Sequence, residues 1–175
     1  LEDIEKNYFE VAHQITVTGK YTGRFDVTLL INGLPFVQIE LEKPGVEINQ
    51  AFNQVLRYKR DGNYKGLFNF IQIFVISNEQ HTRYFANNDT DIRKSNCFVW
   101  TDMENENVNL LYDFEEEFLF CPFLFRMVFD YMIDSASQKK LFVMRPYQIV
   151  ATEKILNRIE VSTNYKKMGT IEAGG

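Results

Sequence analysis

The chain has 175 residues, sixteen of them Phe, and a formal net charge of −5. This length and apolar content suffice for one well-buried domain, and the negative charge speaks against indiscriminate polyanion binding by the isolated chain. Only two Cys residues and no Cys or His at metal-ligand spacing exclude a disulfide framework and a structural zinc site, and no apolar run is long enough to span a membrane. We therefore expect a cytoplasmic protein that does not enter the membrane.

The first half of the chain predicts a sheet interrupted by one helix. Strands are expected over residues 8–18, 24–31, 35–42, 68–78 and 81–87. Over residues 47–60 the apolar residues recur at intervals of three and four, which predicts a helix with Gln54 and Tyr58 on one polar stripe. The last two strands are expected at the centre of the sheet, because residues 68–78 are apolar on both faces.

The second half predicts mainly helices. Residues 86–106 are polar and are expected as loop, with a short strand at 97–100. The spacing over 108–134 is helical, bent or split at Pro122, and another helix is expected over 145–159 with Pro146 in its first turn. The expected fold class is therefore α/β: a mixed central sheet flanked by helices, followed by a C-terminal helical segment.

Two acidic residues stand on the hairpin of residues 24–42, where apolar residues would be cheaper to bury. The turn decides whether they meet. A two-residue Asn-Gly loop pairs Ile31 with Leu34 and puts Asp26 and Glu40 on opposite sides of the sheet, whereas a three-residue Asn-Gly-Leu loop with Gly33 left-handed pairs Asp26 directly with Glu40.

In the second register the two carboxylates repel each other unless a cation lies between them. Mg²⁺ suits such a place, since it prefers one or two carboxylates, water and a substrate phosphate. The chemistry that this favours is metal-assisted hydrolysis of a phosphodiester. In the first register the two acidic residues would have no joint role, and the chain would be a binding domain that is not a nuclease.

The pattern D26-x13-E40-x-E42 on a hairpin, followed by a helix with Q54-V-L-R-Y58, resembles the PD-(D/E)xK nuclease superfamily in its branch with a Gln-x-x-x-Tyr helix. The segments GRFDVTLLINGLPFVQIEL, AFNQVLRY and LFVMRPYQIVATEKIL resemble the N-terminal part of the R (HsdR) subunit of type I restriction-modification enzymes. This resemblance runs over nearly the whole chain. It implies a restriction-endonuclease-like fold.

The resemblance also implies roles for five residues. Asp26 and Glu40 become ligands of Mg²⁺, with the Leu41 carbonyl as a third. Gln54 and Tyr58 become the supporting pair, which orients DNA phosphate or the acidic residues.

A basic cluster surrounds the end of the predicted helix and consists of Arg57, Lys59, Arg60 and Lys65. It is either a solvated helix end, where cations are favourable, or a contact for DNA phosphates. Further along, Arg145 and Gln148 resemble the segment that leads into an ATP-driven DNA translocase, where they would bind nucleotide in the full-length subunit only. No Gly-x-x-x-x-Gly-Lys-Ser/Thr motif is present, so this chain is not expected to hydrolyse ATP.

Three parts follow from the resemblance: an endonuclease core over 1–106, a helical linker region over 107–140, and the start of the translocase domain over 141–175, truncated before its phosphate-binding loop. The implied function is Mg²⁺-dependent hydrolysis of phosphodiester bonds in unmodified double-stranded DNA after ATP-driven translocation. The implied partners are double-stranded DNA and the methyltransferase and specificity subunits.

One residue departs from the family pattern, because Glu42 stands where the motif has Lys. Lys43 follows it, but strand alternation points Lys43 to the other face unless a bulge turns it inward. Losing a group that stabilises developing charge costs on the order of a hundredfold or more in rate. The sequence therefore predicts weak or absent cleavage, and the alternative is an inactive module of the same fold that holds DNA or couples subunits.

Overall fold

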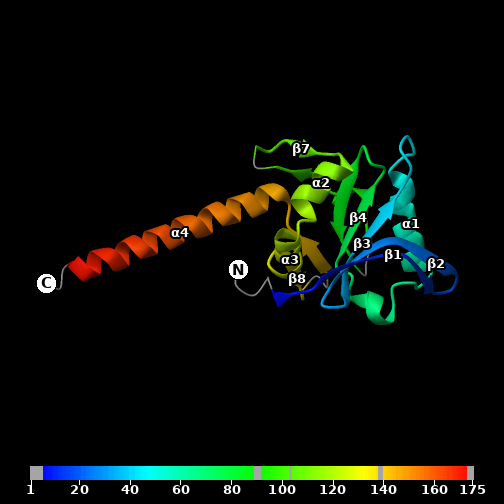
Figure 1. Ribbon diagram of the computed structural model, residues 1–175, viewed down its shortest axis with the longest axis horizontal. Coiled ribbons are helices and arrows are strands. Elements are labelled where there is room, and N and C mark those ends of the chain that lie inside the picture. Colours follow the sequence, from blue (N-terminus) through cyan, green and yellow to red (C-terminus); the bar gives the residue numbers. More distant parts are fainter. Residues whose placement is uncertain (1–5, 89–91, 103, 138–139, 173–175) are drawn as a thin grey trace.

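The computed structural model describes residues 6–88, 92–102, 104–137 and 140–172 (Figure 1). A mixed five-stranded sheet in the order β1-β2-β3-β4-β5 forms its centre. The strands are β1 (Phe9–Thr18), β2 (Thr22–Ile31), β3 (Leu34–Leu41), β4 (Ile73–Ser77) and β5 (Thr82–Ala86). Only the β3–β4 pair is parallel, because the chain crosses over between these strands through a helix. The α/β fold class is confirmed.

Helices cover the two faces of the sheet. On one face lie α1 (Asn49–Arg60) and the short 3₁₀ helix η2 (Gly66–Phe70), and on the other lie α2 (Leu111–Phe118) and α3 (Cys121–Phe129). The apolar stripe of α1 enters a cluster with the strands through Ala51, Phe52 and Val55. A second cluster joins the helical residues Phe114 and Phe118 to the opposite side of the strands. The central strands of the sheet are thus covered on both sides, as in other α/β proteins, whereas β1 is largely exposed.

The hairpin between β2 and β3 combines features of both expected registers. Asn32 and Gly33 have φ angles of 53° and 76°, and Ile31 pairs with Leu34, so the turn is the two-residue type that Asn-Gly favours. The three-residue loop was therefore wrong. Between the pairs Leu30–Pro35 and Leu29–Val37, however, β3 contains one extra residue, a β-bulge that shifts the register by one. This shift brings the acids to one place.

The bulge residue is Phe36, which is buried and packs its ring against Phe129 of α3 at 5.3 Å. Its carbonyl accepts a hydrogen bond from the Gln72 backbone N–H at 2.9 Å, in the segment that leads into β4. Because the neighbouring Pro35 has no N–H to give to the ladder, an irregular strand costs little at this point. Beyond the bulge the pairs are Thr28–Gln38 and Val27–Ile39, and one further step of the same register sets Asp26 opposite Glu40.

Side-chain alternation on β2 is interrupted at Asp26. Strict alternation would place Phe25 and Val27 on one face, yet Phe25 lies in the cluster beneath α1 and Val27 packs against the cluster on the other side. Opposite this point, between the pairs His13–Val27 and Ile15–Phe25, Gln14 of β1 has a left-handed φ of 54°. Phe25 and Val27 therefore lie on opposite faces, and the strand is irregular where its acidic residue lies.

Three other expectations are corrected. The strands of residues 68–78 and 81–87 do not form the centre of the sheet: β3 is the central strand and β5 is an edge strand. Residues 66–70 are a 3₁₀ helix, so β4 begins only at Ile73. The helix expected to continue to 134 ends at Phe129 after a break before Pro122, and Met132–Ser135 is a strand instead.

Two small two-stranded sheets complete the body. One pairs β6 (Trp100–Thr101) with β7 (Asn107–Val108), and the other pairs β8 (Met132–Ser135) with β9 (Lys140–Val143). A single 3₁₀ turn, η3 (Lys94–Asn96), precedes the first of them. Its neighbour Phe98 forms an isolated bridge with Tyr84, which protects part of the β5 edge.

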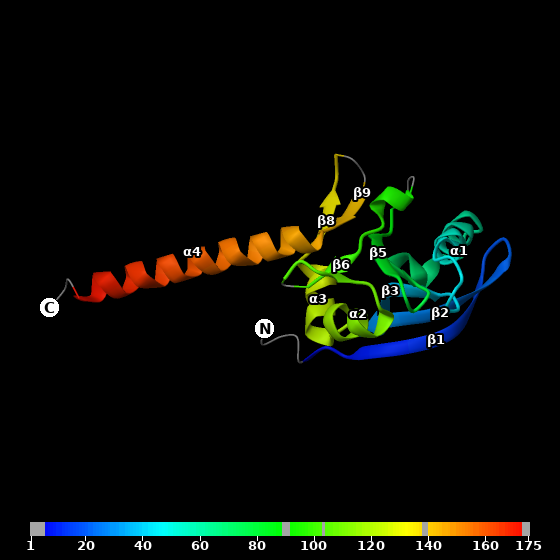
Figure 2. The same cartoon turned by 90° about the horizontal axis from the view of Figure 1, so that it is seen from above.

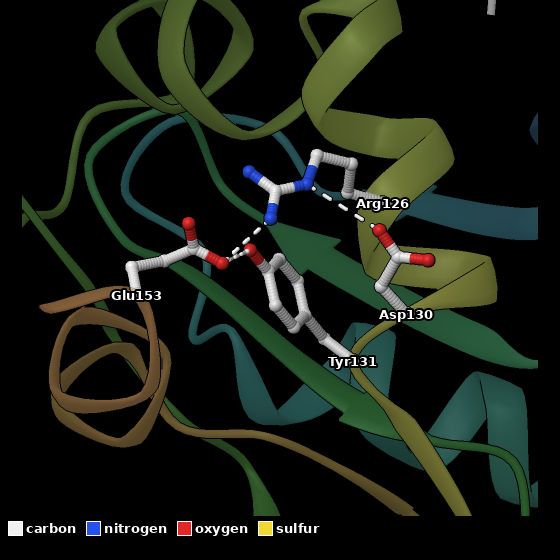
Figure 3. A network of polar contacts seen from close by, with 4 residues as sticks. All are labelled: Arg126, Asp130, Tyr131 and Glu153. Carbon is white, nitrogen blue, oxygen red and sulfur yellow. Dashed lines mark hydrogen bonds and ion pairs between the residues drawn. The ribbon is translucent and has the colours of Figure 1, made fainter. Parts of the chain in front are cut away.

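The chain ends in one long helix, α4 (Pro146–Glu172), which extends away from the body in both views (Figures 1 and 2). A set of polar contacts fixes its start to α3 (Figure 3). The Arg126 guanidinium lies 2.6 Å from the Glu153 carboxylate, and the Tyr131 hydroxyl donates to the same carboxylate oxygen at 2.6 Å. We call Arg126, Tyr131 and Glu153 the helix clamp. Within the described residues, none of the helices has the length and apolar character needed to cross a membrane.

Candidate active site

Two carboxylates meet where β2 and β3 separate. The β2–β3 ladder ends at Val27–Ile39, and just beyond it the Asp26 carboxylate accepts a hydrogen bond from the Leu41 backbone N–H at 2.9 Å. Because the two strands diverge here, the Leu41 N–H finds its acceptor in the Asp26 side chain and not in the main chain of β2. Asp26 is half-buried, and the neighbouring Glu40 is fully buried. We call Asp26, Glu40 and the Leu41 backbone the acidic site.

Two glutamine side chains hold the Glu40 carboxylate. Gln38, two residues earlier on β3, donates from Nε2 to one carboxylate oxygen at 2.7 Å, and Gln54 of α1 donates to the other oxygen, also at 2.7 Å. The side-chain amide oxygen of Gln38 in turn accepts a hydrogen bond from the Thr28 hydroxyl at 2.9 Å. Each oxygen of Glu40 therefore has a fixed donor, and its plane is set by groups on two strands and a helix.

Tyr58 ties this arrangement to the backbone of β2. It lies one helical turn after Gln54, whose amide donates to the Tyr58 hydroxyl at 3.0 Å. That hydroxyl donates to the Arg24 carbonyl at 2.6 Å. The ring comes this close because residue 23 is Gly: a Cβ there would lie 2.8 Å from the Tyr58 ring. The Gln-x-x-x-Tyr spacing thus gives one continuous chain of hydrogen bonds from Glu40 to β2.

The electrostatics of Glu40 are unusual for a carboxyl group. Burial, and then the negative charge of Asp26, raise its pKa from 4.5 to about 8, although the hydrogen bonds from Gln54 and Gln38 act in the opposite direction. Amide donors alone therefore do not compensate the charge. A cation beside the two carboxylates would do so, because opposite charge favours the ionised form.

The donor set fits a hard divalent cation that keeps water in its coordination shell. Two acidic side chains and a neighbouring backbone carbonyl are what Mg²⁺ takes from a protein when a substrate phosphate supplies more oxygen. In the part of the chain that the structure describes, no three His, Cys, Asp or Glu side chains group as a metal site. The donors present thus suit Mg²⁺ better than a metal that needs a complete cage of side chains.

Glu42 follows the acidic site on the chain, two residues after Glu40. Its backbone N–H continues the β3–β4 ladder to the Ser77 carbonyl at 2.8 Å, and its half-buried side chain lines an open polar cleft of ≈ 550 Å³ along α1. Gln54, Arg57 and Arg60 line the same cleft. Lys43 is exposed and is not among the lining residues. No lysine therefore lines this cleft among the residues described.

The predicted basic cluster divides into two parts. Arg57 and Arg60 are exposed and line the cleft beside Glu42, with the Arg57 guanidinium 5.3 Å from the centre of the Tyr58 ring. Lys59 points elsewhere, because its ammonium donates to the Asn87 side chain and to the Asn88 carbonyl. Lys65 is exposed immediately before η2. The structure thus brings two of the four residues to the cleft that Glu42 and Gln54 line.

Arg145 and Gln148 meet at the start of α4, away from the acidic residues. The Gln148 side chain accepts a hydrogen bond from the Arg145 backbone N–H at 2.9 Å, while the Arg145 guanidinium lies 4.5 Å from the centre of the Phe98 ring. Both residues line a cavity of ≈ 450 Å³ together with Tyr147. The structure confirms that they are neighbours and leaves their role a prediction.

Sequence reasoning gave no role to two residues of the site. Gln38 and Thr28 supply one side of the hydrogen-bond chain to Glu40. The signal was present, because Gln38 shares its strand face with Glu40 and Thr28 pairs with Gln38 across the hairpin. A polar residue two positions before a buried acid on a central strand is a candidate partner for that acid.

A mixed five-stranded sheet with helices on both faces and acidic residues at the end of a central hairpin is consistent with a restriction-endonuclease-like fold. Residues 1–93, just over half of the chain, match the family described as type I restriction enzyme R protein N terminus. The chain belongs to this family.

Curated relatives agree with this assignment. The chain is 46% identical over 159 residues to the endonuclease subunit of type I restriction enzyme SauCOLORF180P from Staphylococcus aureus, covering 91% of the chain and 17% of that protein. It is 43% identical over 167 residues to the EcoprrI endonuclease subunit from Escherichia coli, covering 92% of the chain and 52% of that protein. The chain thus spans about a sixth of the first relative and about half of the second.

Proposed function

We propose that this chain is the endonuclease region of an R subunit and that its acidic site holds Mg²⁺ for hydrolysis of phosphodiester bonds in double-stranded DNA. The observation that carries the proposal is the pairing of Asp26 with the buried Glu40, whose pKa is raised by burial and by Asp26. A buried acid without a cation is costly, and such groups cluster at functional sites. The relatives of the chain are named as endonuclease subunits, which supports the same activity.

In this proposal each residue has a separate task. Asp26, Glu40 and the Leu41 carbonyl hold Mg²⁺, which when bound polarises the phosphoryl group and makes water a better nucleophile. Gln54 and Tyr58 keep the Glu40 carboxylate in place through their hydrogen bonds. The cations that line the cleft, Arg57 and Arg60, contact DNA phosphates.

The larger protein supplies the rest. We propose that DNA is cut after ATP-driven translocation, in a complex with methyltransferase and specificity subunits, and that ATP binds only in the full-length subunit. The division into a nuclease core over 1–106, a linker region over 107–140 and the start of a translocase over 141–175 belongs to the same proposal. Arg145 and Gln148 would then serve nucleotide binding there.

Glu42 sets the level of activity in this proposal. A carboxylate in place of the motif lysine adds negative charge beside the cleft where the attacking water and phosphate would lie, and Lys43 is exposed outside the cleft. The test is cleavage of a plasmid by the assembled enzyme with Mg²⁺ and ATP, comparing this sequence with Glu42→Lys. We expect Glu42→Lys to cut at least about a hundredfold faster, the usual effect of one charge-stabilising group.

The control for charge is Glu104→Lys, an equal change at an exposed residue in the turn between β6 and β7. It should leave the rate unchanged. No gain with Glu42→Lys would contradict the role given to position 42. If the native sequence and Glu42→Lys both fail to cut but both bind DNA in a gel-shift assay, the second candidate function holds. In that case the chain is an inactive module that holds DNA or couples subunits. That candidate is favoured by the absence of a lysine from the cleft among the described residues.

A further inference from the structure

One tyrosine beside the acidic site has a hydroxyl group with no assigned partner. Among the described residues, the Tyr64 hydroxyl oxygen is the one buried side-chain nitrogen or oxygen without a hydrogen bond. Buried polar groups in native proteins are nearly always satisfied, so an exception calls for a specific explanation. Tyr64 belongs to the loop between α1 and η2 and is not part of the Gln-x-x-x-Tyr pattern.

Aromatic rings from three elements hold Tyr64 in place. Its ring stacks on Phe25 of β2 at 4.9 Å, meets Phe74 of β4 at 5.1 Å, and contacts Tyr58 of α1 edge-on at 6.4 Å. A ring packed in this way cannot turn its hydroxyl to solvent without opening the cluster beneath α1. The hydroxyl is therefore fixed within the cluster beneath α1.

The ring contacts place Tyr64 next to the hydrogen-bond chain that holds Glu40, because its neighbour Tyr58 accepts a hydrogen bond from Gln54, which also donates to Glu40. Burial raises the pKa of Tyr64 well above 10, and the neighbouring ionisable groups Glu40 and Tyr58 raise it further. The phenol thus stays protonated and offers a hydrogen-bond donor. Glu40 can accept it, because a carboxylate has about four acceptor positions, and Gln38 and Gln54 donate one hydrogen bond to each oxygen.

We propose that Tyr64 is a positioning residue of the acidic site, whose hydroxyl donates through one water to the Glu40 carboxylate and holds it toward Asp26. The inference rests on the proposed metal-binding function. A bridging water needs two to four polar partners, and the Tyr64 hydroxyl and the Glu40 carboxylate supply two. The hydroxyl of Tyr64 then does for the carboxylate what outer partners do for metal ligands in general.

The test is Tyr64→Phe, which removes one oxygen atom and keeps the ring. Mn²⁺ serves as the probe for the Mg²⁺ site, and its binding to the 175-residue chain is followed by electron paramagnetic resonance. We expect the Mn²⁺ dissociation constant to rise about tenfold, the lower end of the usual effect for partners of metal ligands. The melting temperature without metal should not fall, because the variant loses no hydrogen bond between protein groups.

The matched control is Tyr8→Phe, the same change at a side chain that is 77% exposed, and it should leave Mn²⁺ binding unchanged. If the native chain and Tyr64→Phe bind Mn²⁺ equally and the variant has a higher melting temperature, the hydroxyl is merely an unsatisfied group. This result would overturn the role of Tyr64 but not the proposed metal-binding function. An unfolded variant would overturn this role too, as it would make the hydroxyl a structural element. A native chain that binds no Mn²⁺ would overturn the proposed function as well.

Discussion

The acidic site and the helix clamp each bring a carboxylate and a tyrosine hydroxyl together, yet with opposite electrostatics. In the clamp, Glu153 is 40% exposed and has the Arg126 guanidinium 2.6 Å away. Hydrogen bonds from Tyr131 and Arg126 lower its pKa. In the acidic site, Glu40 is fully buried, receives two amide donors and faces Asp26, so its pKa rises to about 8.

The clamp already contains the cation that balances its carboxylate, whereas the acidic site would need a bound ligand to balance its two carboxylates. The clamp carries its own cation at a place where solvent keeps desolvation small, so it stabilises the start of α4 and needs nothing further. The acidic site puts like charges together in the interior, where each unpaired charge is costly. Such an arrangement lowers stability, and in the proposed function a bound cation compensates it.

The largest expected effect comes from removing the charge of the buried acid. Glu40→Gln should weaken Mn²⁺ binding at least a hundredfold, since it removes one of two carboxylate ligands. In the Glu42→Lys background it should slow plasmid cleavage on the order of a thousandfold. Electron paramagnetic resonance and a cleavage time course measure the two effects.

Glu153→Gln is the matched change in the clamp and should alter neither quantity by more than about twofold. The comparison between the two regions would fail if Glu40→Gln kept native Mn²⁺ affinity, or if both variants lost it to the same extent. Circular dichroism of both proteins would show whether the folded state is intact.

The pH dependence of stability should also reveal Glu40. Its pKa is about 8 in the folded chain and 4.5 ordinarily, so between these values the folded state holds a proton that the unfolded state has released. Stability from this group is therefore greatest at low pH and falls as pH rises from about 4.5 to about 8, by on the order of 5 kcal/mol. Urea unfolding at pH 5, 6, 7 and 8 in the presence of EDTA measures this loss.

Glu40→Gln cannot titrate at this position and should lose less stability over the same range. Other carboxyl groups contribute equally to both proteins, so the difference between the two curves isolates residue 40. Mn²⁺ should restore stability at pH 8 in the native chain alone. Parallel curves would contradict the raised pKa and, with it, the view that the site lacks a compensating charge.

Sequence reasoning reached the five strands of the central sheet, α1 and the first half of α4, but it missed the short strands β7, β8 and β9. It placed Asp26 and Glu40 together for the wrong reason: the turn has two residues, and the bulge at Phe36 restores the register. A bulge depends on what packs against it, here Phe129 of α3, and this contact lies far away in the sequence. The interrupted alternation at Asp26 was unpredictable for the same reason.

The partners of Glu40 were predictable in part. The helical spacing of Gln54 and Tyr58 put both on one stripe, and the resemblance gave them a supporting role, in agreement with their hydrogen bonds. Tyr64 could not be found, because its place depends on the path of the loop after α1 and on three aromatic contacts. The clamp was missed as well, since helix α3 meets α4 through residues 27 positions apart.

The smallest expected effect is in the clamp itself. Glu153→Gln should lower the free energy of unfolding at pH 7 by less than about 1 kcal/mol, because the pair is partly exposed and screened by solvent. The pKa of Glu153 lies below 4.5 in the folded chain, owing first to the Tyr131 hydroxyl and then to Arg126. Its contribution is therefore present above pH 4.5 and is lost as pH falls through the lowered value, opposite in sign to that of Glu40.

Urea unfolding at pH 7 and pH 3, compared between the native chain and Glu153→Gln, measures this contribution. The two proteins should differ at pH 7 and converge at pH 3, and 1 M NaCl should shrink the difference at pH 7 because salt screens an exposed ion pair. A difference that grows at low pH would give Glu153 the sign of a buried, uncompensated acid. The carboxylates of the clamp and of the acidic site would then contribute to stability with the same dependence on pH. The clamp could no longer serve as the example of a compensated carboxylate against which the need of Glu40 for a cation is argued.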